Sequence, residues 1–245
     1  MSFAFVPVSA GTFFSAGLVM YTVLPSPMLH TITGLRFQPL VDFHSGQAVA
    51  HEVLVEIHNV NLDVLFASLP TRCALQIFFW QANTLLQMPD KGQYWLNLPA
   101  DQLLDAKAIG LLLALRHQQR LTIEIQDPLT LIRMSATEQR RIHHALLQLK
   151  AAGWKIWLDD LTQDLADDYA RLALPVDGIK LDRSELNTPA RFDALVRFVR
   201  EKIARAVVVE GIETAQDLQR ACASGARFGQ GFLWPESRID ASVTA

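Results

Sequence analysis

The chain has 245 residues, with 22 Lys and Arg against 25 Asp and Glu, and a formal net charge of −3 at pH 7. Half of the residues are hydrophobic (50%), which is typical of a globular chain and excludes a disordered one. The length suits one large α/β barrel or two small domains, and the absence of a basic run with interleaved aromatic residues gives no support for a DNA or RNA polymer as partner.

Residues 1–34 contain no Lys, Arg, Asp or Glu. This apolar stretch approaches the length of a membrane span, but it lacks the basic start of a signal peptide. Three interpretations stay open: a membrane anchor, a packed or loosely structured extension, and a natural start at Met20 or Met28. We favour an extension of uncertain role on a cytoplasmic protein. Cys73 and Cys222 lie outside any CxxC spacing, so we expect two free thiols in a reducing cytoplasm.

From residue 35 onward, short apolar runs alternate with amphipathic stretches. The runs that predict strands are residues 35–43, 48–57, 94–98, 121–125, 154–160, 178–182, 206–211 and 228–234. The patterns that predict helices are residues 135–153, with a Ser135–Glu138 capping box and a stop at Gly153, residues 190–203, and residues 214–225, with Thr214 as cap and Gly225 beyond the end. The segment FHSGQ is expected to join the first two strands as a hairpin.

This alternation predicts an α/β protein with a parallel sheet and crossover helices. The strands are mostly continuous apolar runs, which indicates a sheet buried on both faces. About seven or eight such units fit a TIM-like (β/α)8 barrel. No linker divides the chain, so we expect one barrel domain over residues 35–240 after the extension at 1–34.

Polar residues interrupt or end most of these strands. They are Glu52, Asn97, Glu124, Asp159, Asp160, Lys180, Glu210 and Gln230. Because strand ends converge on one mouth of a parallel barrel, we expect these side chains to form a single ring. Each one alone has an ordinary interpretation: Asp160 as a helix cap, Asn97 in a turn, and Lys180 as a cation that reaches solvent. These ordinary interpretations do not explain well why polar residues recur at the ends of most strands.

A ring of carboxylates and an amide is an oxygen-rich ligand set that suits Mg²⁺ or Mn²⁺. The neighbouring carboxylates of Asp159 and Asp160 repel each other unless cations lie between them. Such a pair at one strand end can bridge two cations about 4 Å apart, the arrangement used for in-line phosphoryl displacement. The sequence therefore predicts a two-metal site.

The same residues carry a resemblance to a known family. The segments QPLVDFHSGQAVAHEVL, YWLNLPADQL, LTIEIQD, WLDDL, LPVDGIKLDRSEL, VVVEGIET and GQGFLWP follow one another in the order and spacing of the EAL domain family. That family comprises bacterial phosphodiesterases that hydrolyse cyclic di-GMP, and the resemblance covers about residues 36–235. Glu52 stands in the place of the glutamate that names the family.

The resemblance implies a TIM-like barrel with one antiparallel strand and two Mg²⁺ or Mn²⁺ ions that activate a water, giving linear pGpG. The metal ligands it implies are Glu52, Asn97, Glu124, Asp159, Asp160 and Glu210, with Asp159 bridging. Lys180 would orient or polarise the attacking water, and it forms the catalytic set with Glu52 and Asp159. Gln230 would contact a ligand or the substrate, and Glu213 would anchor the loop after strand five. A homodimer is common in the family.

Two segments depart from the family pattern. The motif EALLR reads EVLVE here, so Glu56 replaces the arginine that holds a substrate phosphate. The glycine-rich DDFGTGYSS reads DDLTQDLAD, which removes the permissive backbone of a mobile loop and adds negative charge. The ExTE segment also changes, at Gln126 and Asp127.

Three functions follow from these observations. The first is a metal-dependent cyclic di-GMP phosphodiesterase with reduced activity, favoured by the complete ligand ring. The second is a receptor that binds cyclic di-GMP without cleaving it. The third is a degenerate EAL domain that regulates motility or adhesion proteins by binding them, which Glu56 and the altered loop favour.

Overall fold

The computed structural model of the chain describes residues 32–57, 71–89, 92–116 and 118–240. The predicted extension at residues 1–34 lies almost wholly outside these ranges, and the prediction of one domain over residues 35–240 stays a prediction. In the described part of the chain, no helix combines the length and the apolar character needed to cross a membrane.

Eight strands close into a barrel, because β1 pairs with β8 on one side and with β2 on the other. The strands are β1 (Ile32–Asp42), β2 (Gln47–Ile57), β3 (Tyr94–Pro99), β4 (Leu121–Gln126), β5 (Lys155–Leu161), β6 (Gly178–Leu181), β7 (Ala206–Val209) and β8 (Phe228–Gly229). Strand β1 runs antiparallel to both of its barrel neighbours, and the other neighbouring pairs are parallel. The predicted TIM-like barrel with one antiparallel strand is confirmed.

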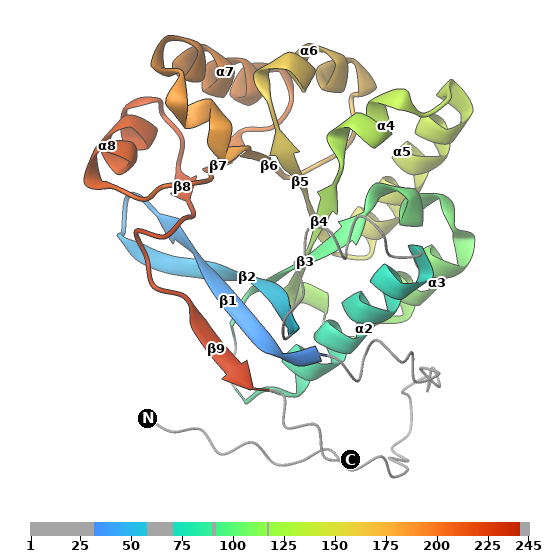
Figure 1. Cartoon of the computed structure of the whole chain (residues 1–245). Coiled ribbons are helices and arrows are strands. Elements are labelled where there is room, and N and C mark those ends of the chain that lie inside the picture. The colour runs from blue at the N-terminus through green and yellow to red at the C-terminus, as the bar shows by residue number, and fades with distance from the viewer. Residues whose placement is uncertain (1–31, 58–70, 90–91, 117, 241–245) are drawn as a thin grey trace.

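One further strand was not predicted. Strand β9 (Ser237–Asp240) pairs antiparallel with β1 and lies on the outside of the barrel (Figure 1). The predicted strand over residues 228–234 was too long, since β8 ends at Gly229. Gly231 adopts a φ of +153°, and its backbone packs against that of Ile212, so the chain turns away from the barrel before β9.

Helices surround the strands on the outside of the barrel (Figure 1). In the described residues they are α2 (Thr71–Gln87), α3 (Ala106–Ala114), α4 (Pro128–Arg133), α5 (Ala136–Ala151), α6 (Gln163–Leu172), α7 (Pro189–Lys202) and α8 (Ala215–Ala223), with short 3₁₀ turns η2 (Ala100–Leu104), η3 (Gln118–Arg120) and η4 (Arg183–Asn187). The Ser135–Glu138 capping box begins α5 as predicted, and Thr214 forms a second box at α8. Gly153 and Gly225 have positive φ just after the ends of these helices.

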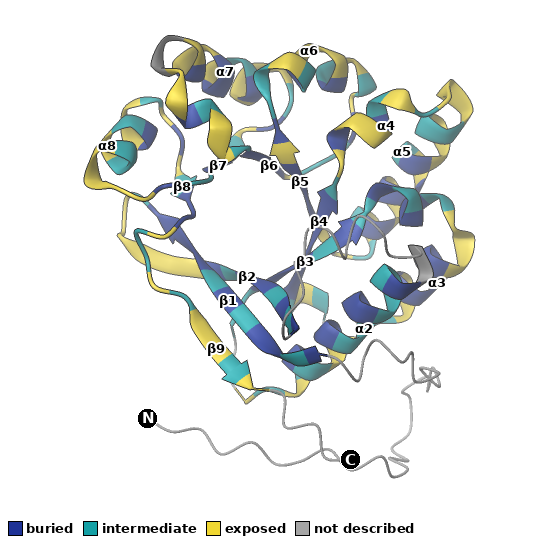
Figure 2. Ribbon diagram, viewed as in Figure 1, coloured by how far each residue is buried: buried dark blue, intermediate teal, exposed yellow. Residues whose placement is uncertain are grey.

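The barrel interior is filled, not open. Most residues of the barrel strands are buried, apart from the exposed start of β2, whereas β9 is mostly exposed (Figure 2). One interior layer holds the cluster of Leu40, Ala50, Trp95, Trp157 and Val208, with the Trp95 and Trp157 ring centroids 4.4 Å apart. A side chain at Gly178 would collide with the Trp157 ring, so glycine is what admits this large aromatic residue. The layer is an apolar floor for the residues that follow it on each strand.

The C-terminal end of β1 is tied to β8 by a charged contact. Asp42 is buried, and its Oδ2 accepts hydrogen bonds from Arg227 Nε and Nη2 at 3.1 and 2.9 Å, while its Oδ1 accepts from His44 N at 2.8 Å. The bonds from Arg227, and then the one from the His44 backbone, hold the pKa of Asp42 below its usual range. A lowered carboxyl pKa stabilises the fold above the unfolded-state value and loses that effect as pH falls through the folded value.

Replacing Asp42 by Asn keeps the shape and removes the charge, so we expect a lower free energy of unfolding at pH 7. The loss should shrink as the pH falls below about 4, where the carboxyl of the unfolded chain is protonated. Urea denaturation at several pH values measures the free energy of unfolding of the variant and the wild type. Asp193→Asn on the exposed face of α7 is the matched control. Equal losses for the two variants at pH 7 would show that the contact with Arg227 does not stabilise the barrel.

Candidate metal and active site

Eight inward-facing polar side chains, one from each barrel strand or the residue just after it, form one layer above the apolar floor. They are Gln38, Glu52, Asn97, Glu124, Asp159, Lys180, Glu210 and Gln230. On most strands each follows a floor residue by two positions, as the alternation of side chains along a strand requires. Strand β1 runs the opposite way, so Gln38 precedes Leu40. The structure thus brings together the residues that the sequence predicted for one ring.

Lys180 lies at the centre of this layer and is fully buried. Its Nζ contacts four carboxylates: Glu210 Oε1 at 2.6 Å, Glu124 Oε1 at 2.8 Å, Glu52 Oε2 at 3.1 Å and Asp159 Oδ1 at 3.1 Å. Burial alone would lower the pKa of Lys180, but these carboxylates together raise it well above its usual range. The residue is therefore a permanent cation shared among strands that are remote in sequence.

One ammonium does not balance the acids around it. Burial, followed by the charges of neighbouring carboxylates, raises the pKa of Glu124, Glu210 and Asp159 despite the attraction of Lys180. The pKa of Glu52 is instead lowered: burial opposes the shift, but Lys180, Asn97 and Gln230 outweigh it. Without additional cations, most of this cluster is driven towards the protonated state.

Two adjacent aspartates reach the same site because the end of β5 is irregular. In a regular strand, Asp159 and Asp160 would point to opposite faces of the sheet. The pairing of β5 with β6 shifts between Leu158 and Leu161, and Asp160 adopts a left-handed φ of 54°. Asp160 is exposed, yet partial desolvation and the Asp159 charge raise its pKa to about 7. Such backbone strain at a bulge is typical of functional sites.

The donor set fits two divalent cations that share one ligand. Ligand oxygens of Glu52, Glu124 and Asp159 lie within 4.8 Å of one another, and so do those of Asp159, Asp160 and Glu210. Two further buried oxygens, Asn97 Oδ1 and Glu124 Oε2, have no hydrogen-bond partner among the described residues. Carboxylate and amide oxygens are the ligands that Mg²⁺ and Mn²⁺ prefer. The geometry therefore suits the predicted two-metal arrangement with Asp159 in both groups.

Amide side chains orient the carboxylate of Glu52. Asn97 Nδ2 donates to Glu52 Oε1 at 2.9 Å, and Gln230 Nε2 donates to Glu52 Oε2 at 2.6 Å. The amide of Gln230 also donates to Gln38 Oε1 at 2.8 Å. Sequence analysis missed Gln38, although a glutamine two residues before Leu40 on an apolar strand was a signal of an inward polar position.

The segment after Asp160 continues into a helix. Helix α6 begins at Gln163, whose backbone N–H donates to Glu185 Oε1 at 3.0 Å. Arg191 of α7 also donates to Asp164 Oδ1 of this helix at 3.0 Å, so both η4 and α7 hold the segment. Glu213, the residue expected to anchor the loop after strand five, lines a small hollow beside the metal ligands, and its role stays a prediction.

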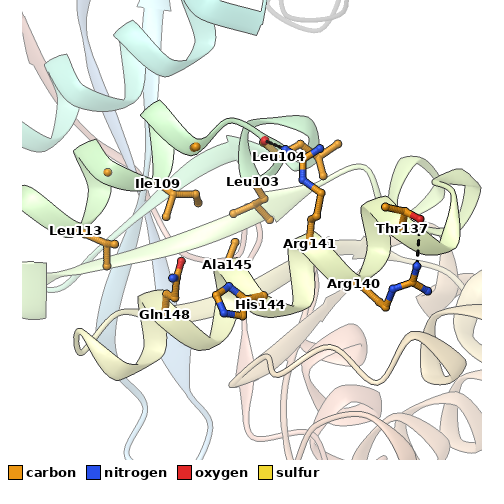
Figure 3. Close-up of a pocket in the computed structure, with 12 residues that line it drawn as sticks. Leu103, Leu104, Ile109, Leu113, Thr137, Arg140, Arg141, His144, Ala145 and Gln148 are labelled. Atoms are coloured by element: carbon orange, nitrogen blue, oxygen red, sulfur yellow. Dashed lines mark hydrogen bonds between the residues drawn. The ribbon is translucent and has the colours of Figure 1, made fainter.

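The larger hollow in the described structure lies away from the carboxylates. It has a volume of about 510 Å³ and lies outside the barrel between η2, α3 and α5 (Figure 3). Its lining includes Ile109, Leu113, Arg140, Arg141 and His144, and no acidic residue. By its volume this hollow would be a candidate substrate site, but its lining has none of the carboxylates that the predicted chemistry needs.

Replacing Asp159 by Asn should raise the thermal stability of the metal-free protein and reduce the stability that the protein gains from metal. Because its pKa is raised, ionisation of Asp159 costs folding free energy, and the stability of the metal-free protein falls as pH rises through the raised value. We therefore expect Asp159→Asn to be more stable than the wild type in EDTA at pH 8, and to gain less from Mn²⁺. Thermal unfolding measures both, with exposed Asp167→Asn as control. An unchanged gain from Mn²⁺ would contradict a shared ligand.

Replacing Lys180 by Met should destabilise the metal-free protein by about 3–5 kcal/mol, because four carboxylates lose the ammonium that they share. Mn²⁺ should restore more stability to this variant than it adds to the wild type. Urea denaturation in EDTA and in Mn²⁺ provides the comparison, and Lys202→Met on the exposed end of α7 is the control. A loss no larger than that of the control would rule out the shared counter-ion.

Comparisons with known proteins agree with this architecture. A sequence model described as the EAL domain matches residues 33–237. A comparison with curated proteins finds no match. An EAL domain protein from Listeria monocytogenes EGD-e has a similar structure, with a TM-score of 0.63 and 22% identity, over 85% of this chain and 90% of that one.

Two further solved structures are similar. BlrP1 of Klebsiella pneumoniae, in a calcium/cyclic di-GMP complex, has a TM-score of 0.68 and 19% identity over 89% of this chain. The YkuI protein of Bacillus subtilis, in complex with its substrate cyclic di-GMP and calcium, has a TM-score of 0.69 and 22% identity over 85% of this chain. The match covers 61% and 56% of those longer chains, so the likeness is one of fold over part of their length.

Proposed function

Because this chain belongs to the EAL domain family, we propose that it hydrolyses cyclic di-GMP to linear pGpG with two divalent cations, Mg²⁺ or Mn²⁺. The observation that supports this most strongly is the pair of carboxylate groups that share Asp159 at the barrel mouth. Two relatives of the same fold were solved with this nucleotide and calcium.

The ligand roles divide between the two groups. Glu52, Asn97, Glu124 and Asp159 would hold one cation, and Asp159, Asp160 and Glu210 would hold the other. When bound, divalent cations supply the Lewis acidity that in-line displacement at phosphorus needs.

The protein's own groups then position the reactants. Lys180 stays protonated, and its three N–H groups face four carboxylates. Where a bound cation took over one of these carboxylates, the released N–H would donate a hydrogen bond to the attacking water and hold that oxygen in line with the scissile bond. Gln230 and Asn97 keep the Glu52 carboxylate in one orientation. Attack would form a bond from the water oxygen to phosphorus while the bond from phosphorus to the 3′ oxygen breaks. The attacking water gives up one proton and the leaving 3′ oxygen takes up one, so the ring opens to linear pGpG.

The departures from the family pattern argue for slow turnover. Glu56 cannot hold a phosphate, and α6 replaces a loop that glycines would make mobile. These two features also favour a second candidate function, a degenerate EAL domain that acts as a non-catalytic protein-binding regulator or a cyclic di-GMP receptor. A homodimer and a protein partner among motility or adhesion regulators remain predictions.

Incubation of purified protein with cyclic di-GMP and Mg²⁺ or Mn²⁺, with pGpG followed by chromatography, tests the proposal. We expect product from the wild type and a loss of about a hundredfold or more for Glu52→Gln, since a ligand carboxylate disappears. Glu201→Gln, an exposed substitution on α7, should behave like the wild type.

The absence of product at high enzyme concentration would reject the phosphodiesterase. Calorimetry would then separate the alternatives. Nucleotide binding without turnover identifies a receptor, whereas no heat of binding leaves the protein-binding regulator.

A further inference from the structure

A small hollow beside the metal ligands carries two arginines. It has a volume of about 200 Å³, and Glu210 and Gln230 of the polar layer form part of its wall. Arg36 enters it from β1, and Arg183 enters it from η4, directly after β6. These two guanidinium groups are the cations of the lining, which also includes Glu213 and Glu236.

Arg36 keeps donor capacity for a ligand. Its Nε lies 3.5 Å from Glu236 Oε2, a loose ion pair, and its side chain is 30% exposed. A guanidinium presents several N–H donors in a planar fork, and one loose contact uses few of them. Glu236 therefore orients Arg36 in the hollow without occupying it fully.

Arg183 is exposed, and no acidic residue of the described chain lies within ion-pair distance of it. Its position is set by close backbone packing. Gly211 has a φ of +71°, and a side chain there would collide with the Cβ of Arg183. Glycine thus lets the segment after β7 press against the base of Arg183 and hold it at the hollow.

The carboxylate of Glu56 on β2 forms an ion pair with an arginine of β9. Glu56 Oε1 lies 3.0 Å from Arg238 Nη1 of β9, and β9 places this arginine opposite Arg36 on the neighbouring strand β1. Glu56 is absent from the lining of the hollow. The charge that replaced the family's arginine is therefore paired and does not face an incoming anion.

We propose that Arg36 and Arg183 together bind a phosphodiester at the barrel mouth. They would replace the arginine that the family has at the position where this chain has Glu56. The inference rests on the proposed function for its substrate, a cyclic dinucleotide. Two forks that approach from β1 and η4 can share the phosphate oxygens, and such charge-assisted bonds favour a phosphodiester over a neutral ligand. The side chains that bind the phosphodiester would thus lie on β1 and η4, and not on β2.

Calorimetric titration of cyclic di-GMP in Ca²⁺ measures binding separately from hydrolysis. We expect Arg36→Ala and Arg183→Ala each to raise Kd about tenfold or more, as the loss of a hydrogen bond to a charged group predicts. The double variant should be weaker than either. Arg140→Ala is the matched control. It removes the same charge from the hollow between η2, α3 and α5, and it should keep the wild-type Kd. An unchanged increase in Tm with Mn²⁺ shows that each variant keeps its fold and metal site.

A charge-neutral variant at position 56 tests the replacement itself. Because Glu56 is absent from the lining of the hollow, Glu56→Gln should leave Kd close to the wild-type value. Values of Kd within twofold of wild type for both arginine variants, or a tenfold tightening by Glu56→Gln, would overturn the inference. If the wild type binds and the variants do not, but no pGpG forms, the proposed hydrolysis fails and the arginine pair stands. A wild type that binds no nucleotide rejects both.

Discussion

Electrostatic repulsion at the barrel mouth is the constraint on which the rest of this structure depends. Five carboxyl groups converge there, and among the described residues Lys180 is the one ammonium that contacts them. In a medium of low dielectric, one buried cation does not offset so many like charges. Burial first, and then the charges of neighbouring carboxylates, raises the pKa of Glu124, Glu210 and Asp159. The fold tolerates the cluster because an apolar floor and the surrounding helices stabilise the barrel below it, and because divalent cations can complete the charge balance.

The charged groups around the ligand layer are paired between elements or line the hollow beside it. Glu56 on β2 is matched by Arg238 on β9, while Arg36 and Arg183 line the hollow. The segment after Asp160 is helical, and Glu185 accepts a hydrogen bond from its first helical residue. In the proposed function, these surroundings would determine how the nucleotide is held, and the ligands would supply the chemistry.

Much of this architecture was predictable from the sequence, because strand-end acids and helix caps are local signals. Glu52, Asn97, Glu124 and the two aspartates stood out as polar residues on apolar strands, and the barrel rule then placed them together. Contacts that depend on the closure of the barrel could not be predicted. The four-way contact of Lys180 needs the relative shift of several strands, and the pairing of Glu56 with Arg238 needs β9, which the sequence did not reveal. The left-handed turn at Asp160 has no sequence signature, since aspartate adopts that conformation only sometimes.

In the proposed function, these carboxylates would hold a pair of divalent cations, with Asp159 in both ligand groups. Electron paramagnetic resonance of the Mn²⁺-loaded protein tests it most directly, because two manganese ions that share a carboxylate are magnetically coupled. The account predicts a coupled spectrum in the wild type that reverts to isolated ions, or to less bound metal, in Asp159→Asn. A spectrum of isolated Mn²⁺ at saturation, or no bound Mn²⁺ at all, would contradict it.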